Sequence, residues 1–302
     1  MKISEENAKR VDWQGILAFV MLTIALTWPA EIMAYLKGVR FGGTSAADQS
    51  SAFLLIAVTV VPAFSAWIVR ATATKEGFAT AGLRMGRWQY FALTWIAVPW
   101  IYLVIYGSSL ALGLARFNPA FAQFAPAQIS WTLAASLSLF IVPALVPAFG
   151  SQFGWTGFVL PKLLPLGRWP AAIGYGLLWG ATLLPLAALG YLYAGYPAGY
   201  VLIVLFTCAL GMVEAALRIR AGSLYLSIFF AAAFSSQAHG IAPVAVFVTQ
   251  PLLGGIAGIV GIVVLAAIGA WLLATTPQAA IDAILAQPAK SRAKRTGRSR
   301  SA

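Results

Sequence analysis

Long apolar stretches separated by short polar ones dominate this chain. A helix needs roughly 20 apolar residues to cross the hydrocarbon core of a bilayer. Eight stretches are close to that length, at about 15–36, 52–71, 90–113, 130–149, 170–190, 197–217, 222–238 and 252–274. The pattern therefore predicts an all-α, polytopic membrane protein with about eight transmembrane helices.

The composition favours the same class. Of 302 residues, 61% are hydrophobic and 9% are charged, with a mean hydropathy of +0.84, more apolar than a soluble core requires. The single cysteine, Cys208, lies in an apolar stretch, which predicts a packing residue and excludes a disulfide framework. The first stretch is too long for a signal-peptide core, so we expect an uncleaved span. No prenylation cysteine stands near the final Ser-Ala.

Basic residues group in alternate loops. If the eight stretches are spans, 17 of the 20 lysines and arginines fall on one side, and only Lys37, Arg40 and Arg116 fall on the other. Because such residues accumulate in cytoplasmic loops, both termini are predicted to be cytoplasmic. We expect an N-terminal segment at 1–14, a transmembrane domain at 15–275 and a basic, disordered tail at 276–302.

The tail carries six basic residues and no acid after residue 285, too polar to bury a core. Beside a span, such a segment attracts anionic lipid, and no nucleic-acid partner is expected. A second basic segment, residues 74–90, mixes four basic residues, counting Arg70, with aromatic and small ones. Two interpretations stay open for it: a short element lying at the lipid headgroups, or a solvated connector.

Residues 150–166, GSQFGWTGFVLPKLLPL, form a glycine-punctuated segment after the fourth apolar stretch. The segment resembles the first motif of the CPBP intramembrane proteases, the CAAX-protease and bacteriocin-immunity (Abi-like) family, which often reads G-E-E-x-G-W-R-G-x-L-L-P-x-L. The matching positions are Gly150, Gly154, Trp155, Gly157, Leu160, Pro161 and Leu163. The two motif glutamates fall on Ser151 and Gln152, and the motif arginine falls on Thr156. The glycine and tryptophan frame is present without the charged groups.

The fifth stretch is similar to the family's second motif, often W-x-x-W-H-x-P. Trp179 and Pro185 match, and the histidine position is Leu183. Gly176 and Gly180 form a G-x-x-x-G pair, a spacing that lets another helix approach closely.

The seventh stretch is similar to the third motif, T-G-S-L followed by H-x-x-x-N. Residues 222–224 match, whereas the histidine falls on Ala231 and the asparagine on Ser235. The i, i+4 spacing that places both on one helix face is kept.

Four further polar residues lie in or near apolar stretches. Glu214 and Arg218 are one turn apart near a cytoplasmic helix end, which predicts a structural ion pair. Glu31 and His239 are both expected near the outer face, in independent interfacial roles. A Ser-His-Glu device built from Ser235 or Ser236, His239 and Glu31 stays open as an alternative.

The resemblance implies a CPBP-type bundle with its motif core at about 150–240, and an intramembrane endopeptidase activity of the CAAX-processing type. The motif-matched residues Ser151, Gln152, Thr156, Leu183, Ala231 and Ser235 cannot exchange a proton near neutral pH. We therefore expect an inactive pseudoprotease, without cofactor or metal, that binds or scaffolds a membrane-embedded or lipidated partner. The alternatives are an endopeptidase with a non-standard site and a small-molecule or lipid transporter.

From the same resemblance we expect a bacterial inner-membrane location. We also expect Gln152, Thr156, Leu183, Ala231 and Ser235 to converge on one cavity that opens toward the cytoplasmic half of the bundle.

Overall fold

Helices account for nearly all of the regular structure. The structure is a computed structural model that describes residues 10–41, 51–193 and 196–286, with only the backbone of 51–53. The first half holds α2 (Trp13–Leu36), α4 (Ser51–Thr72), the 3-10 turn η1 (Phe78–Ala81), α5 (Trp88–Ala111), β1 (Ala115–Phe117), the 3-10 turn η2 (Phe121–Gln123), α6 (Pro126–Ala134), the π-helical turn η3 (Ala135–Leu139) and α7 (Ile141–Gly154). Then follow η4 (Trp155–Val159), also π-helical, α8 (Leu160–Leu163), the 3-10 turn η5 (Leu164–Leu166), α9 (Arg168–Thr182), α10 (Leu184–Ala188), α11 (Gly199–Ala221), α12 (Leu224–Ser236), the 3-10 turn η6 (Gln237–His239), α13 (Ile241–Ala245), β2 (Val246–Val248), α14 (Ile259–Ala274) and α15 (Gln278–Leu285). The two short strands pair antiparallel, with Arg116 opposite Phe247.

The all-α, polytopic class predicted from the sequence is confirmed, with fewer full-length spans than eight. Within the described residues, six helices are long and apolar enough to cross a membrane, or seven if α14 and α15, bent by 82°, count as one. The predicted span at 170–190 breaks into α9 and α10 at Leu183. Pro185 lacks an N–H to continue the helix, which is the physical reason for the break. At about 1.5 Å per residue, the 15 residues of α9 alone are short for a span.

Two pairs of glycines bring helices into direct backbone contact. A Cβ atom on Gly150 would lie 2.6 Å from the Thr59 carbonyl oxygen of α4, and one on Gly154 would lie 2.6 Å from Pro62. A Cβ on Gly176 would lie 2.5 Å from the Cα of Cys208 in α11. The first motif therefore fixes α7 on α4, and the G-x-x-x-G pair fixes α9 on α11.

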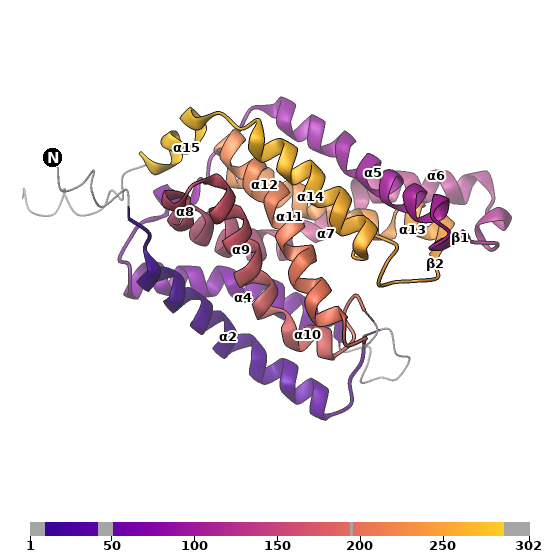
Figure 1. Cartoon of the computed structure of the whole chain (residues 1–302), viewed down its shortest axis with the longest axis horizontal. Helices are drawn as coiled ribbons and strands as arrows, with labels where there is room; N and C mark the ends of the chain where they lie inside the picture. The colour runs from indigo at the N-terminus through magenta and orange to yellow at the C-terminus, as the bar shows by residue number, and fades with distance from the viewer. Residues whose placement is uncertain (1–9, 42–50, 194–195, 287–302) are drawn as a thin grey trace, which may run out of the picture.

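Basic residues from distant parts of the chain gather at one end of the bundle. Lys162 of α8 lies 2.7 Å from Asp12 and 3.1 Å from Glu76, and Arg70 lies 3.5 Å from the same glutamate. Arg168 donates to carbonyl groups at the end of α14. Figure 1 shows α8 and α15 at this end and β1, β2 and α13 at the opposite end. The grouping matches the alternation of basic loops, and the cytoplasmic orientation of this end stays a prediction.

The segment after α14 is more ordered than predicted. A disordered tail was expected from residue 276, but Gln278–Leu285 forms α15, which buries Ile281 and Ile284. These residues are three apart, so they share one helix face that packs on the basic end. The predicted N-terminal segment up to residue 9 and the tail from 287 onward, with its expected contact to anionic lipid, lie outside the described residues.

Topology is open to a direct measurement. We expect reporter fusions next to Lys75 and after residue 286 to report the cytoplasm, and fusions next to Arg116 and Tyr196 to report the outer side, because the basic end should face inward. Paired reporters that are active on opposite sides of the membrane would check each position. An outer location for the C-terminal fusion would contradict this orientation.

The Asp12–Lys162 contact should respond to acid. Burial raises the pKa of Asp12, but hydrogen bonds from Lys162 and from the Gly15 N–H outweigh it, so the pKa lies below its ordinary value of 3.8. The contact therefore stabilises the fold at and above pH 4 and is lost as the pH falls through the lowered pKa. Asp12→Asn keeps the N-cap and should lower the unfolding free energy by up to about 1 kcal/mol at pH 7. Thermal unfolding in detergent should show that difference vanish at low pH.

Candidate functional site

The residue at the position of the second motif glutamate lies in the bundle interior rather than at a cavity. Gln152 of α7 is 1% exposed, and its side-chain nitrogen donates to Oε1 of Glu214 at 2.8 Å. The Thr156 hydroxyl lies one turn later, within the π-helical turn η4, and is 2.9 Å from both the side-chain and the backbone oxygen of Gln152. Two motif positions thus belong to one buried polar cluster, which we call the Glu214 cluster: Gln152, Thr156, Tyr175 and Glu214.

Glu214 has two hydrogen-bond donors from other helices. Its second carboxylate oxygen accepts a hydrogen bond from the hydroxyl of Tyr175 in α9, and Glu214 itself is 1% exposed. The predicted ion pair with Arg218 is wrong, because no described basic group lies within ion-pair distance of Glu214. Arg218 instead donates to the carbonyl of Ala81 in η1. The carboxylate of Glu214 binds donors on α7 and α9. Glu214 and Arg218 therefore do not pair, although they lie one turn apart on α11.

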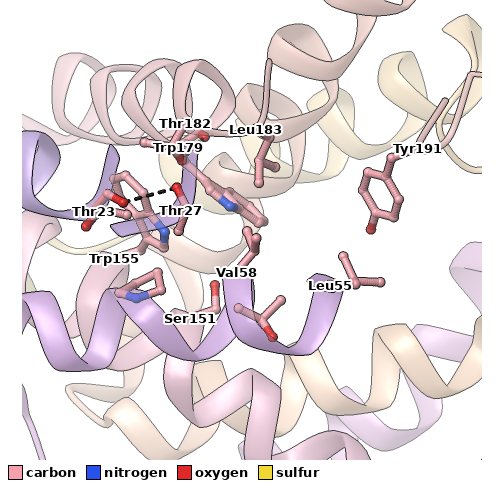
Figure 2. Close-up of a pocket in the computed structure, with 12 residues that line it drawn as sticks. Thr23, Thr27, Leu55, Val58, Ser151, Trp155, Trp179, Thr182, Leu183 and Tyr191 are labelled. Atoms are coloured by element: carbon pink, nitrogen blue, oxygen red, sulfur yellow. Dashed lines mark hydrogen bonds between the residues drawn. The ribbon is translucent and has the colours of Figure 1, made fainter. Parts of the chain in front are cut away.

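A cavity of about 70 Å³ lies beside this cluster, between α2, α4, α7 and α9. Figure 2 shows the side chains that surround it, with Ser151 and Leu183 both on its wall. The lining residues are Thr23, Thr27, Leu55, Val58, Thr59, Pro62, Ser151, Trp155, Trp179, Thr182, Leu183 and Tyr191. None of them carries a carboxylate or an imidazole. The cavity can offer hydroxyl groups and aromatic faces to a ligand, and no strong base.

Aromatic rings separate the cavity from the buried carboxylate. Trp155 and Trp179 line the cavity, and each packs on the ring of Tyr175, with centroids 6.2 and 6.0 Å apart. The Tyr175 hydroxyl reaches Glu214 on the inner side. Glu214 is therefore close to the motif frame and shielded from the cavity.

The predicted convergence on one cavity is wrong. Leu183 lines the cavity, Gln152 and Thr156 join the Glu214 cluster, and Ser235 lines a separate pocket of about 400 Å³ with Phe140, Ser236 and His239. Ala231 is partly buried against the main core. Successive residues on a helix differ in direction by about 100°, so Ser151 and Gln152 face different neighbours.

The Ser-His-Glu alternative also fails to assemble as proposed. His239 packs edge-on against Phe140, with ring centroids 5.9 Å apart. Glu31 is fully buried in α2, and neither carboxylate oxygen has a hydrogen-bond partner. Ser236 donates to the carbonyl of Ser136 at 2.6 Å. Ser235, Ser236 and His239 line one pocket, and Glu31 is not among the residues that line it.

Sequence reasoning missed Tyr175 and the actual partners of Glu214. A signal was present: a carboxylate inside an apolar helix requires donors, and Tyr175 brings a hydroxyl on the helix that the G-x-x-x-G pair fixes against α11. These two considerations identify the pairing of α9 with α11 and the need of Glu214 for a hydrogen-bond donor. They do not identify the residue that supplies the donor.

A comparison with known protein families bears on the region that holds the first-motif frame and its polar cluster. The family described as Type II CAAX prenyl endopeptidase Rce1-like matches residues 131–237, which hold every motif position. A comparison with curated proteins gave no match. Residues 131–237 are therefore similar to this family, which supports the resemblance to the CPBP and CAAX proteases that the motifs indicate.

The Glu214 cluster should contribute measurably to stability. Tyr175→Phe removes one donor and leaves a buried carboxylate oxygen unsatisfied, which should lower the unfolding free energy by about 1–3 kcal/mol. Tyr200→Phe, at a half-exposed position, is the matched control. Thermal unfolding of the detergent-solubilised protein measures both.

In a Glu214→Gln background, the effect of Tyr175→Phe should shrink, because a neutral acceptor loses less when its donor is removed. Equal melting temperatures for Tyr175→Phe and Tyr200→Phe would show that the hydrogen bond contributes nothing.

Proposed function

We propose that this CAAX-protease-like protein binds a membrane-embedded or lipidated partner without hydrolysing it. The main support for this proposal is the composition of the cavity wall. Ser151 and Leu183 lie there among hydroxyl, aromatic and aliphatic groups. Glu214, the carboxylate that contacts the motif residue Gln152, is buried behind Tyr175 and accepts hydrogen bonds on both oxygens.

Hydrolysis of a peptide bond would need more than this wall provides. A water molecule must be activated by a base or a metal, and donors must face the developing oxyanion. A serine hydroxyl without an adjacent base is a weak nucleophile at neutral pH. Within the part of the chain that the structure describes, no three His, Cys, Asp or Glu side chains stand together as metal ligands. The residues that line the cavity therefore support recognition of a partner rather than proteolysis.

The size of the cavity limits what can enter it. About 70 Å³ is well below the roughly 300–1,000 Å³ of sites that enclose a whole ligand. A single side chain, or the terminal part of a lipid-like group, fits this space. The proposed partner therefore lies mainly along the outside of α2, α4 and α9 and inserts one group between Trp155 and Trp179. We place the protein in a bacterial inner membrane with both termini in the cytoplasm.

One observation favours a second candidate, an endopeptidase that uses another site. Ser235, Ser236 and His239 line the same outer pocket of about 400 Å³, and a serine beside a histidine is a recurrent nucleophile and base pair. Against it, Ser236 already donates to a backbone carbonyl. This candidate predicts cleavage that depends on His239.

Purified full-length protein should leave a prenylated CAAX peptide uncleaved, with or without added zinc, while a photo-crosslinking version of the peptide labels it. Leu183→Trp should fill the cavity and reduce labelling about tenfold, the loss that about 1.4 kcal/mol produces. Leu205→Trp, on the exposed face of α11, is the control for the added ring. Mass spectrometry of the peptide and counting of crosslinked protein provide the two measurements.

Cleavage by the wild-type protein would contradict the proposal. If His239→Ala then abolished that cleavage, the endopeptidase candidate would take its place. Equal labelling of Leu183→Trp and Leu205→Trp would show that the cavity is not the binding site.

A further inference from the structure

Two segments far apart in the sequence are hydrogen-bonded together at the basic end. The N–H of Leu224 donates to the carbonyl of Gly82 at 2.8 Å, and the hydroxyl of Ser223 donates to the carbonyl of Arg84 at 2.6 Å. In return, Nε of Arg84 donates to the carbonyl of Gly222 at 2.8 Å. Gly82 and Gly222 have φ values of 76° and 60°, which favour glycine. Residues 82–87, which we call the arginine loop, are thus tied to the start of α12.

A buried guanidinium lies under this loop. Arg218 is 0% exposed, and its Nη2 donates to the carbonyl of Ala81 at 3.1 Å, while Nε and Nη1 have no hydrogen-bond partner. A side chain at Gly82 would collide with the guanidinium, so the two are in direct contact. Among the described residues, no carboxylate lies within ion-pair distance of Arg218.

A second positive charge close to Arg218 makes its position more costly. Arg84 is close enough for the two positive charges to repel each other. A buried charge without a partner costs several kcal/mol, and two arginines side by side increase that cost. The start of α12 adds the positive end of a helix dipole at the same place. The site is therefore complementary to an anion.

The exposed surface of the arginine loop indicates where the anion comes from. Leu83 is 40% exposed, Met85 is 73% exposed and Trp88, which follows the loop, is 73% exposed. Exposed apolar and tryptophan side chains next to basic ones are typical of elements that lie at the membrane interface. Figure 1 shows the start of α5 and the start of α12 toward the end that holds α15. A phosphate reaching this site is therefore one carried by a lipid.

We propose that Arg84 and Arg218 bind the phosphate of an anionic lipid headgroup, with Leu83, Met85 and Trp88 inserted beside it. Guanidinium groups match phosphate oxygens with two parallel hydrogen bonds. Arg84 is exposed and meets the headgroup first, and an N–H on one of the unpartnered nitrogens of Arg218, Nε or Nη1, completes the site when the arginine loop admits the phosphate. This site is independent of the cavity and of the proposed partner binding.

Thermal unfolding of the full-length protein in detergent, titrated with short-chain phosphatidylglycerol, tests the site. A bound lipid should raise the melting temperature in proportion to its occupancy. Arg84→Gln should weaken the apparent affinity about fivefold, the effect of about 1 kcal/mol per basic residue. Arg87→Gln is the matched control, because Arg87 is exposed on the same loop and its side chain donates to Gln89. Arg218→Gln should abolish the shift.

Additional titrations distinguish a lipid phosphate from free phosphate, and the comparison of two variants covers the case in which Arg218→Gln does not fold. Phosphatidylcholine and inorganic phosphate should each shift the melting temperature far less than phosphatidylglycerol, and an equal shift with inorganic phosphate would overturn the lipid assignment. Equal losses for Arg84→Gln and Arg87→Gln would overturn the site in favour of diffuse attraction. If Arg218→Gln does not fold, the Arg84 and Arg87 comparison alone decides.

Discussion

The bundle depends on one buried carboxylate and the two donors that satisfy it. Glu214 of α11 accepts hydrogen bonds from Gln152 of α7 and Tyr175 of α9, so a single residue connects three helices that lie far apart in sequence. In an interior without water, an unsatisfied carboxylate would be costly, and each donor fixes the position of its helix. The amide at 152 is required for this arrangement, because a glutamate there would face Glu214 and one of the two would have to hold a proton. The departure from the family motif is therefore coupled to a residue outside the motif.

Close helix contacts make that cluster possible. Gly150 and Gly154 let α7 lie against the backbone of α4, and Gly176 lets α9 lie against α11. Bulkier residues at these positions would move the helices apart by more than a hydrogen bond can span. The glycine frame thus has a structural role that does not depend on the family's charged residues, which explains how the motif can be recognised although those residues are absent.

Much of the fold follows from local sequence, and much of the site does not. Apolar length predicted nearly every long helix, because burial in lipid is decided residue by residue along a span. The break at Leu183 depends on Pro185 and could have been anticipated. The partners of Glu214 could not, since the choice between Arg218 on its own helix and donors on α7 and α9 is made by packing. The separation of Ser151 from Gln152 likewise requires the rotation of α7 about its axis, which a motif does not encode.

The helix that carries the first motif is much longer than a bilayer is thick. Residues 126–166 form a run of 41 residues, about 60 Å at the usual rise, against a hydrocarbon core of about 30 Å. Such a helix is accommodated only by a steep tilt or by leaving part of its length outside the core. Ser151 and Trp155 lie on this helix and line the cavity, so the depth of the cavity in the bilayer follows from how the helix is accommodated. Bilayer thickness, and with it the acyl-chain length of the host membrane, therefore sets the level at which the cavity meets the lipid.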